Sequence, residues 1–269
     1  MTGISLNLLQ VAVVLLCWFF EQTFPRLKNR NDSLLRLWSI GVLWAACLGA
    51  VAVCQLFFFQ PLIDLLAPLK VVSISQLPIP QVVGFALSFL LLDFCGYSMH
   101  WISHKISPLW ALHSVHHADR HVTAATGLLH HPLEAVFSFI AILCLMILFG
   151  VSLQVIVVFS LVSTFHNLLV HANLNIPLSA DRVLRWFIVT PDMHRIHHSV
   201  SLREGNTNFG QIFPYWDRIF RTYLHQSSKP LGMILMGLPE AMQRKKFNAF
   251  QLLAQPFQSL HFDTHIRQK

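Results

Sequence analysis

The sequence predicts an all-α membrane protein with about four to five transmembrane or re-entrant helices and a cytoplasmic helical cap rich in histidine. The first observation is composition: of 269 residues, 54% are hydrophobic and only 12% are charged, and the mean hydropathy is +0.55. Soluble domains carry roughly 25% charged residues, so an isolated soluble domain of this composition would expose a very large apolar surface. The second observation is the presence of 16 histidines, because polar ionisable side chains are costly inside a bilayer unless they have a chemical role.

Charge and cysteine usage exclude other classes of protein. The formal net charge is +7, but the basic residues form no long run and no stripe interleaved with aromatic residues, so no nucleic-acid partner is expected. Positive loops that face an anionic leaflet explain the charge more simply. The five cysteines lie in apolar stretches without CxxC spacing, which indicates helix packing rather than a disulfide framework.

Two apolar stretches open the chain, and each is long enough for a span of about 20 residues. Residues 4–24 form the first predicted helix, which is expected to be retained because it has no basic leader and no cleavage site. Residues 37–59 form the second, which is expected to end before Pro61. Residues 1–60 are therefore predicted to be an N-terminal transmembrane helix pair, and the proline-rich residues 61–80 a connecting loop or short interfacial helix.

A third apolar helix and a hairpin follow. The third helix begins at Gln81 and runs to about His100. Two further apolar runs, residues 133–149 and 153–170, are separated at Gly150. Each run is slightly short for an upright span, so a re-entrant hairpin and two full crossings are both consistent with the sequence.

The basic residues predict the orientation of these helices. Positively charged loops favour the cytoplasmic side, and the loop between the first two helices carries Arg26, Lys28, Arg30 and Arg36. The third helix then returns to the cytoplasm, so nearly all the histidines are expected on that side. After residue 170 the chain is more polar, with two predicted helices and then loops to residue 224, and residues 225–269 form a weakly amphipathic tail.

The histidines form clusters with helical spacing. Residues 100–104 read HxxxH, and residues 113–117 and 194–198 both read HxxHH. Positions i, i+3 and i+4 share one helix face, and neutral imidazole is a common ligand of iron, zinc and copper. The three clusters supply eight candidate ligands, enough for two metal ions: His100, His104, His113, His116, His117, His194, His197 and His198. Isolated histidines are more simply polar anchors at a membrane surface, which is the interpretation for His121, His225, His261 and His265.

A long, ordered set of motifs surrounds these clusters. The motifs are, in order, DFCGYSMHWISHKISPLWALHSVHH (93–117), LLHHPLEAV (128–136), HANLNIP (171–177), VTPDMHRIHHS (189–199) and NTNFGQIFPYWDRIFRTY (206–223). In these motifs the sequence resembles the fatty acid hydroxylase / sterol desaturase superfamily, which comprises integral-membrane di-iron oxygenases with histidine boxes. The resemblance covers roughly residues 80–240, so residues 81–224 are expected to form a catalytic domain of this type.

The resemblance implies that the eight box histidines are ligands of two iron ions. It adds His171, which matches a further histidine that many members place between the second and third boxes. His131 matches the HP-x-E position of the family, and His166 lies where some members have HxxxH, so both are further candidate ligands. His166 and His171 are five residues apart, about 140° around a helix, whereas Asn167 faces the same way as His171.

Several polar residues near the boxes are candidates to hold the ligands in place by hydrogen bonds. Asp93 lies seven residues before His100, on nearly the same helical face, and can accept the outer N–H of a ligand histidine; a helix cap or an interhelical hydrogen bond is the alternative. Asp192, just before the last box, and Glu134, just after His131, are similar candidates. Asn167 is a candidate polar neighbour of His171.

On the resemblance, the expected activity is O2-dependent hydroxylation, or another C–H oxidation, of a lipid such as a fatty acyl chain or a sterol. Desaturation and ether-lipid oxidation stay open as alternatives, because they share the first hydrogen abstraction. A metal transporter would need ligands at the bilayer midplane, and a cytochrome b would use single axial histidines on separated helices, whereas these boxes lie at helix ends. The sequence contains no haem, flavin or nicotinamide motif, so a separate electron donor of the ferredoxin or cytochrome b5 type is expected.

Overall fold

The computed structural model describes residues 3–27, 33–238 and 248–259 of the chain. Over these residues the backbone is almost entirely helical, and β-type pairing is limited to two isolated bridges, Pro25 with Leu174 and Ser199 with Met236. The prediction of an all-α fold is confirmed.

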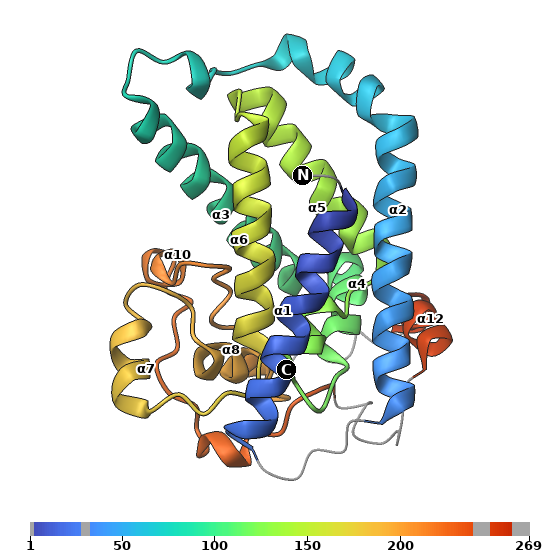
Figure 1. Ribbon diagram of the computed structural model, residues 1–269, viewed down its shortest axis with the longest axis vertical. Coiled ribbons are helices and arrows are strands. Elements are labelled where there is room, and N and C mark those ends of the chain that lie inside the picture. The colour runs from blue at the N-terminus through green and yellow to red at the C-terminus, as the bar shows by residue number, and fades with distance from the viewer. Residues whose placement is uncertain (1–2, 28–32, 239–247, 260–269) are drawn as a thin grey trace.

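Long helices form the body of the molecule (Figure 1). They are α1 (Gly3–Thr23), α2 (Leu34–Leu66), α3 (Gln81–Lys105), α5 (Pro132–Phe149) and α6 (Leu153–His171). By length and composition, α2, α3, α5 and α6 are each able to cross a membrane. Their surfaces agree with lipid contact, because large apolar side chains such as Leu56 and Val82 are 77% and 73% exposed. The prediction of a membrane protein is therefore confirmed.

The second helix continues beyond its expected end. It was expected to stop before Pro61, but α2 runs through this proline to Leu66. A proline inside a helix removes one backbone hydrogen bond and bends the axis, and membrane helices tolerate this because neighbouring turns stay intact. The ribbon of α2 bends near its upper end (Figure 1). Two short 3-10 turns, η1 (Ala67–Leu69) and η2 (Ile74–Gln76), complete the connection to α3.

The helices α5 and α6 form the expected hairpin. They contain 18 and 19 residues, and at 1.5 Å per residue each spans about 27–29 Å, close to the ~30 Å hydrocarbon thickness. Gly150 ends α5 with a φ of +58°. A side chain is excluded there, because a Cβ would lie 2.8 Å from the Cα of Ser73. Ser152 then caps α6 by accepting a hydrogen bond from the backbone N–H of Val155.

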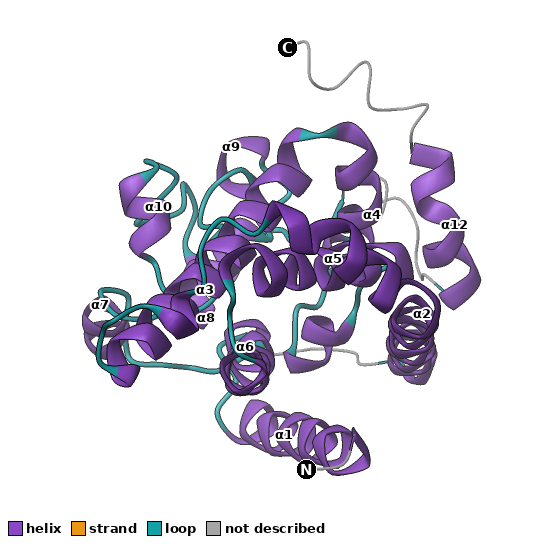
Figure 2. Ribbon diagram, turned by 90° about the horizontal axis from the view of Figure 1, so that it is seen from above, coloured by secondary structure: helices purple, strands orange, loops and turns teal. Residues whose placement is uncertain are grey.

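Shorter elements form a cap at one end of the long helices, opposite the α5–α6 turn (Figure 1). In the view from above, α1 lies beside α6 and α12 lies beside α2 (Figure 2). The cap comprises α4 (Ser107–His117), η3 (Ala124–Leu128), α7 (Leu178–Leu184), α8 (Pro191–His197), α9 (Leu202–Gly205), α10 (Tyr215–Ile219), η4 (Leu231–Met233) and α12 (Ala249–Ser259). The end of α1 and the start of α2 lie at this same end, where Arg26 pairs with Asp192 and Arg36 pairs with Asp119. Arg26 and Arg36 therefore lie at the same end of the helix bundle as the cap.

Within the predicted C-terminal tail, α12 has one buried and one exposed apolar side. Helix α12 packs against α2 and α4, with Leu252 buried and Phe250 80% exposed. His261 and His265 lie outside the described residues.

Candidate metal centre

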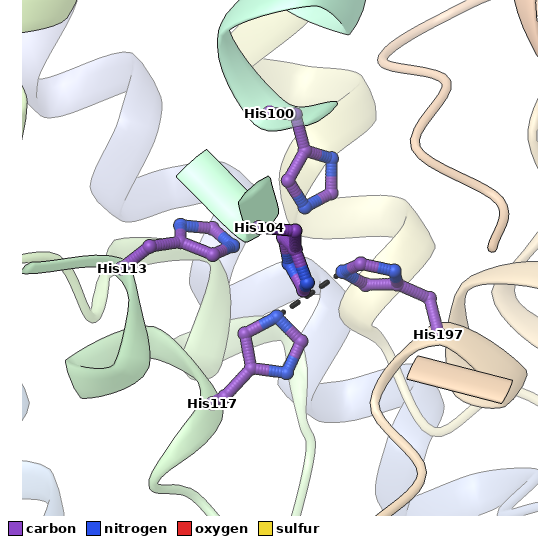
Figure 3. A group of neighbouring side chains, drawn as sticks. All are labelled: His100, His104, His113, His117 and His197. Atoms are coloured by element: carbon purple, nitrogen blue, oxygen red, sulfur yellow. Dashed lines mark hydrogen bonds between the residues drawn. The ribbon is translucent and has the colours of Figure 1, made fainter. Parts of the chain in front are cut away.

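Five histidines converge at the junction of α3, α4 and α8 (Figure 3). His100 and His104 come from the C-terminal part of α3, where the i, i+4 spacing places them on one face. Helix α4 follows after Ile106 and supplies His113 and His117 with the same spacing. His197 completes this group from α8. One ring nitrogen from each of the five histidines lies within 4.8 Å of the others, so this five-histidine group can hold a metal ion.

A second group of four histidines lies beside the first. His116 comes from α4, His171 from the end of α6, His194 from α8, and His198 directly follows α8. All four side chains are buried, and their ring nitrogens also lie within 4.8 Å of one another. The structure thus brings His171 and the eight box histidines together and divides them into two groups, which we call the five-histidine and four-histidine groups.

Hydrogen bonds to the outer ring nitrogens determine which nitrogen faces each centre. In five of the histidines Nδ1 lies within hydrogen-bond distance of an oxygen outside the group: His100 with Phe209 O (3.0 Å), His113 with Glu134 Oε1 (2.7 Å), His116 with Leu129 O (3.1 Å), His171 with Asn167 O (2.6 Å) and His197 with Thr207 O (2.8 Å). A carbonyl or carboxylate oxygen only accepts, so Nδ1 must carry the proton. In a neutral ring, Nε2 then presents a lone pair to the centre of its group.

The contact between His116 and His171 provides a direct test of whether a cation fits. Their Nε2 atoms are 3.0 Å apart, yet both rings use their proton on the outer side. Two lone pairs at this distance repel unless one ring becomes charged. Burial, followed by the neighbouring His130, holds the pKa of His116 well below its usual value, which opposes that charge. A metal ion between the two nitrogens resolves the conflict, and the donor atoms are those that such an ion requires.

The same test holds in the five-histidine group. Among the described residues, Nε2 of His100, His104 and His113 is buried without a hydrogen-bond partner, although buried polar atoms are nearly always paired. Burial also lowers the pKa of His197 to about 3. Its ring is therefore neutral at pH 7, as metal ligation requires. Both groups fit a bound metal ion.

Comparison with known proteins identifies the family. The family model for fatty acid hydroxylase matches residues 85–222, a segment that contains every histidine of both groups. The chain belongs to the fatty acid hydroxylase family.

Members of this family and related enzymes resemble the chain over part of their length. Ornithine lipid hydroxylase OlsE of Rhizobium tropici is 28% identical over 151 residues, which cover 56% of this chain and 44% of the relative. Alkylglycerol monooxygenase of Xenopus tropicalis is 28% identical over 174 residues, covering 63% of this chain and 35% of the relative. A cholesterol 25-hydroxylase-like protein of Caenorhabditis elegans is 28% identical over 158 residues, covering 58% and 48%. The chain thus spans less than half the length of each of these relatives, and no solved structure matches it.

Glu134 lies where a carboxylate was expected to support a ligand. Its Oε1 accepts from Nδ1 of His113 at 2.7 Å, and its Oε2 lies 3.3 Å from Nδ1 of His130. Asn167 also contacts His171, but through its backbone carbonyl oxygen, because its side-chain amide donates to Gly127 O at 2.7 Å. Glu134 therefore neighbours a histidine of the five-histidine group, and Asn167 neighbours one of the four-histidine group.

The two aspartates have different partners from those expected. Asp93 accepts from the backbone N–H of Ile212 at 3.0 Å and from Nε1 of Trp216 at 2.8 Å. Its expected bond to His100 is wrong, because the outer nitrogen of that ring bonds to Phe209 O; Asp93 makes the interhelical type of bond that was the alternative. Asp192 accepts from Arg26 and Arg195 rather than from a histidine.

His131 and His166 lie outside both groups. His131 caps α5, with its Nδ1 accepting from the backbone N–H of Leu133, and its Nε2 lies 3.3 Å from Leu253 O. His166 is buried in α6, and neither of its ring nitrogens has a hydrogen-bond partner among the described residues. The structure therefore gives neither histidine a place among the converging nitrogens.

Two residues that pack against the grouped histidines, His130 and Phe209, were not predicted from the sequence. The ring of His130 stacks on His116 with centroids 4.6 Å apart and an interplanar angle of 5°. Burial alone would lower the pKa of His130, but the Glu134 carboxylate raises it above its usual value. Phe209 is fully buried, and its ring packs against His100, His104 and His197 at 5.1–5.5 Å. The HH pair at 130–131 and the NFG run at 208–210 were the available signals.

The remaining described histidines are peripheral to the centre. His121 and His225 are exposed and belong to neither group.

Proposed function

We propose that this protein is a membrane di-iron oxidoreductase that uses O2 to hydroxylate, or otherwise oxidise, a C–H bond of a lipid such as a fatty acyl chain or a sterol. The observation that carries the proposal is the pair of histidine groups at one end of an apolar helix bundle, in a chain of the fatty acid hydroxylase family. In hydroxylation, O2 supplies one oxygen atom to the C–H bond, and two electrons and two protons convert the other into water.

The nine grouped histidines would be the ligands, five for one iron and four for the other. Two bound irons would supply the redox chemistry that activates O2. The protein's contribution is to fix the tautomers: outward Nδ1–H bonds aim Nε2 of His100, His113, His116, His171 and His197 into the two groups. Rings whose tautomer and orientation are fixed in this way would need little reorganisation to bind a metal ion.

Apolar side chains beside the five-histidine group would bind the lipid. Leu92 on α3 and Val155 and Phe159 on α6 form one buried cluster with Ile212. Leu92 lies two turns before His100 on the same helix. An acyl chain or sterol would then approach the metal centre from the membrane, along the apolar helices that carry these side chains.

The electrons would come from a separate protein of the ferredoxin or cytochrome b5 type, docking on the cap. The positive-inside rule places the basic loop of Arg26 and Arg36 in the cytoplasm, and the cap lies on the same side as this loop. The protein is then a multi-pass membrane protein with a cytoplasmic active site.

Ether-lipid oxidation is the sibling reaction that a specific observation favours, because alkylglycerol monooxygenases are among the relatives. Oxidation of the carbon beside an ether oxygen gives a hemiacetal, which breaks into an aldehyde and an alcohol. Desaturation would instead remove two hydrogens. A membrane metal transporter is disfavoured because the groups lie at the ends of α3 and α6 rather than midway along them.

Two measurements test the proposal together. Metal analysis of the purified chain should find about two irons per protein, and lipid mass spectrometry should find a product that depends on the intact gene. His116→Ala should abolish the product, whereas His225→Ala, which changes an exposed histidine outside both groups, should retain it. A lipid that gains one oxygen indicates hydroxylation. A fatty aldehyde with the length of the alkyl chain indicates ether cleavage, and a lipid that loses two hydrogens indicates desaturation. Zinc or haem without O2 consumption would contradict the proposal.

A further inference from the structure

Three charged side chains of the N-terminal segment reach into the cap. Glu21 belongs to α1, Arg26 follows α1, and Arg36 belongs to the first turn of α2. All three precede the family-matched residues 85–222.

Arg36 fixes the segment that orients His116. Its guanidinium forms a two-pronged pair with Asp119, with Nε to Oδ1 at 3.0 Å and Nη2 to Oδ2 at 2.6 Å. The same Nη2 also lies within hydrogen-bond distance of the hydroxyl oxygens of Thr123 and Thr126 at the start of η3. Helix η3 leads directly to Leu129, whose carbonyl oxygen accepts the outer proton of His116.

Glu21 joins η3 to the segment after His171. Its side chain is buried, and Oε1 accepts from the backbone N–H of Ala124 at 2.9 Å and from that of Asn173 at 2.6 Å. Asn173 lies two residues after His171. This single carboxylate oxygen therefore links the first residue of η3 to the end of α6.

Arg26 joins the segment after α6 to the first turn of α8. Its Nε donates to Oδ1 of Asp192 at 3.2 Å, and its Nη1 donates to Oδ1 of Asn175 at 2.7 Å. Asp192 lies two residues before His194, which belongs to the four-histidine group. Arg26 thus ties the chain after α6 to the start of α8.

The five-histidine group is supported by other residues. The outer protons of His100 and His197 go to the carbonyl oxygens of Phe209 and Thr207. That loop is held by Asp217, which accepts from the backbone N–H groups of Phe209 and Gly210 at 2.8 Å, and by Asp93 further along. Both aspartates lie within the family-matched segment.

We propose that Glu21, Arg26 and Arg36 are positioning residues for the four-histidine group, so that the N-terminal helix pair completes one of the two metal sites and not the other. That the native metal is iron rests on the proposed function, whereas the positioning role of these three residues is independent of which metal binds. The outer bonds of the five-histidine group to Phe209, Glu134 and Thr207 involve none of these three side chains, so we expect that group to keep its support when one of them is removed.

The test is a metal titration of the full chain in detergent, with Fe(II) and separately with Co(II), whose absorption reports ligation independently of activity. Glu21→Leu and Arg36→Met should weaken one of two binding steps by about 10- to 100-fold, the typical effect of losing support around a ligand, and leave the other step unchanged. Glu21→Gln is the matched control, because its amide oxygen still accepts from Ala124 and Asn173, and it should retain both steps.

Double variants identify the affected group. Glu21→Leu combined with His171→Ala should lose no more metal than His171→Ala alone, whereas its combination with His104→Ala should bind no metal tightly. Equal weakening of both steps, or no weakening, would overturn the inference. If one of these variants fails to fold, Arg26→Met replaces it. This substitution removes the bond to Asp192, and it should likewise weaken only one of the two binding steps. A wild-type chain that binds two Co(II) ions but carries no iron when purified would count against the proposed function alone.

Discussion

Replacing Glu134 tests how much of the five-histidine group depends on its support. The carboxylate accepts a short bond from His113 at 2.7 Å and lies 3.3 Å from the outer nitrogen of His130. Hydrogen bonds to charged groups contribute about 1.5–3 kcal/mol, against about 1 kcal/mol for neutral ones. In Glu134→Gln the amide oxygen still accepts from His113, so only the charge assistance is lost, about 0.5–2 kcal/mol. The middle of that range corresponds to about a tenfold weaker metal affinity, since 1.4 kcal/mol is a factor of ten.

Glu134→Ala should have a larger effect, because it leaves the buried Nδ1–H of His113 without an acceptor. We expect about a 100-fold weaker affinity, the upper end of the range for residues that support a ligand. The assay is competition between the purified protein and a chelator of known affinity, followed by metal analysis. Asp64→Asn is the control, because Asp64 is an exposed carboxylate on α2 whose partner is Gln60. Equal metal affinity in the wild type and in both Glu134 variants would refute this account of the site.

Three further predictions concern stability and ligand choice. Metal-free protein should lose stability as the pH falls from 7 to 5: His197 has a pKa of about 3 when folded and about 6.5 when unfolded, so the unfolded state binds more protons, and each such histidine costs about 1.4 kcal/mol per pH unit below 6.5. Thermal melts of chelated protein check this, and a melting temperature that stays flat or rises would contradict it. His166→Ala should retain both metal ions, whereas His171→Ala should lose one; metal loss in both would show that His166 is a ligand. Asp217→Asn should weaken the five-histidine group, because one backbone N–H loses its acceptor at a cost of about 1–3 kcal/mol; an unchanged cobalt titration would refute it.

The sequence was most informative where a pattern is local. The HxxxH and HxxHH spacings identified histidines that share a helix face, and the structure brings all eight together with His171. Helix lengths followed the apolar runs, apart from the continuation of α2 through Pro61. A proline changes only one hydrogen bond, so composition alone does not decide whether a helix ends or bends there.

Features that depend on packing between distant segments were not readable from spacing. The division into five and four histidines depends on how α3, α4, α6 and α8 meet, and no single helix shows it. Asp93 lies on nearly the same face of α3 as His100, yet its oxygens accept from Ile212 and Trp216, more than 100 residues later in the chain. Register on one helix identifies a face, but the partner on that face comes from elsewhere in the chain.

The division of neighbouring residues between the two groups has a consequence for the distance between the metal sites. His116 and His117 are adjacent in the chain but belong to different groups, and the same is true of His197 and His198. Consecutive Cα atoms are 3.8 Å apart across a trans peptide bond, so the chain itself keeps the two groups adjacent at two separate points. Rotation of individual rings can change where their nitrogens point, but it cannot move the two groups far apart.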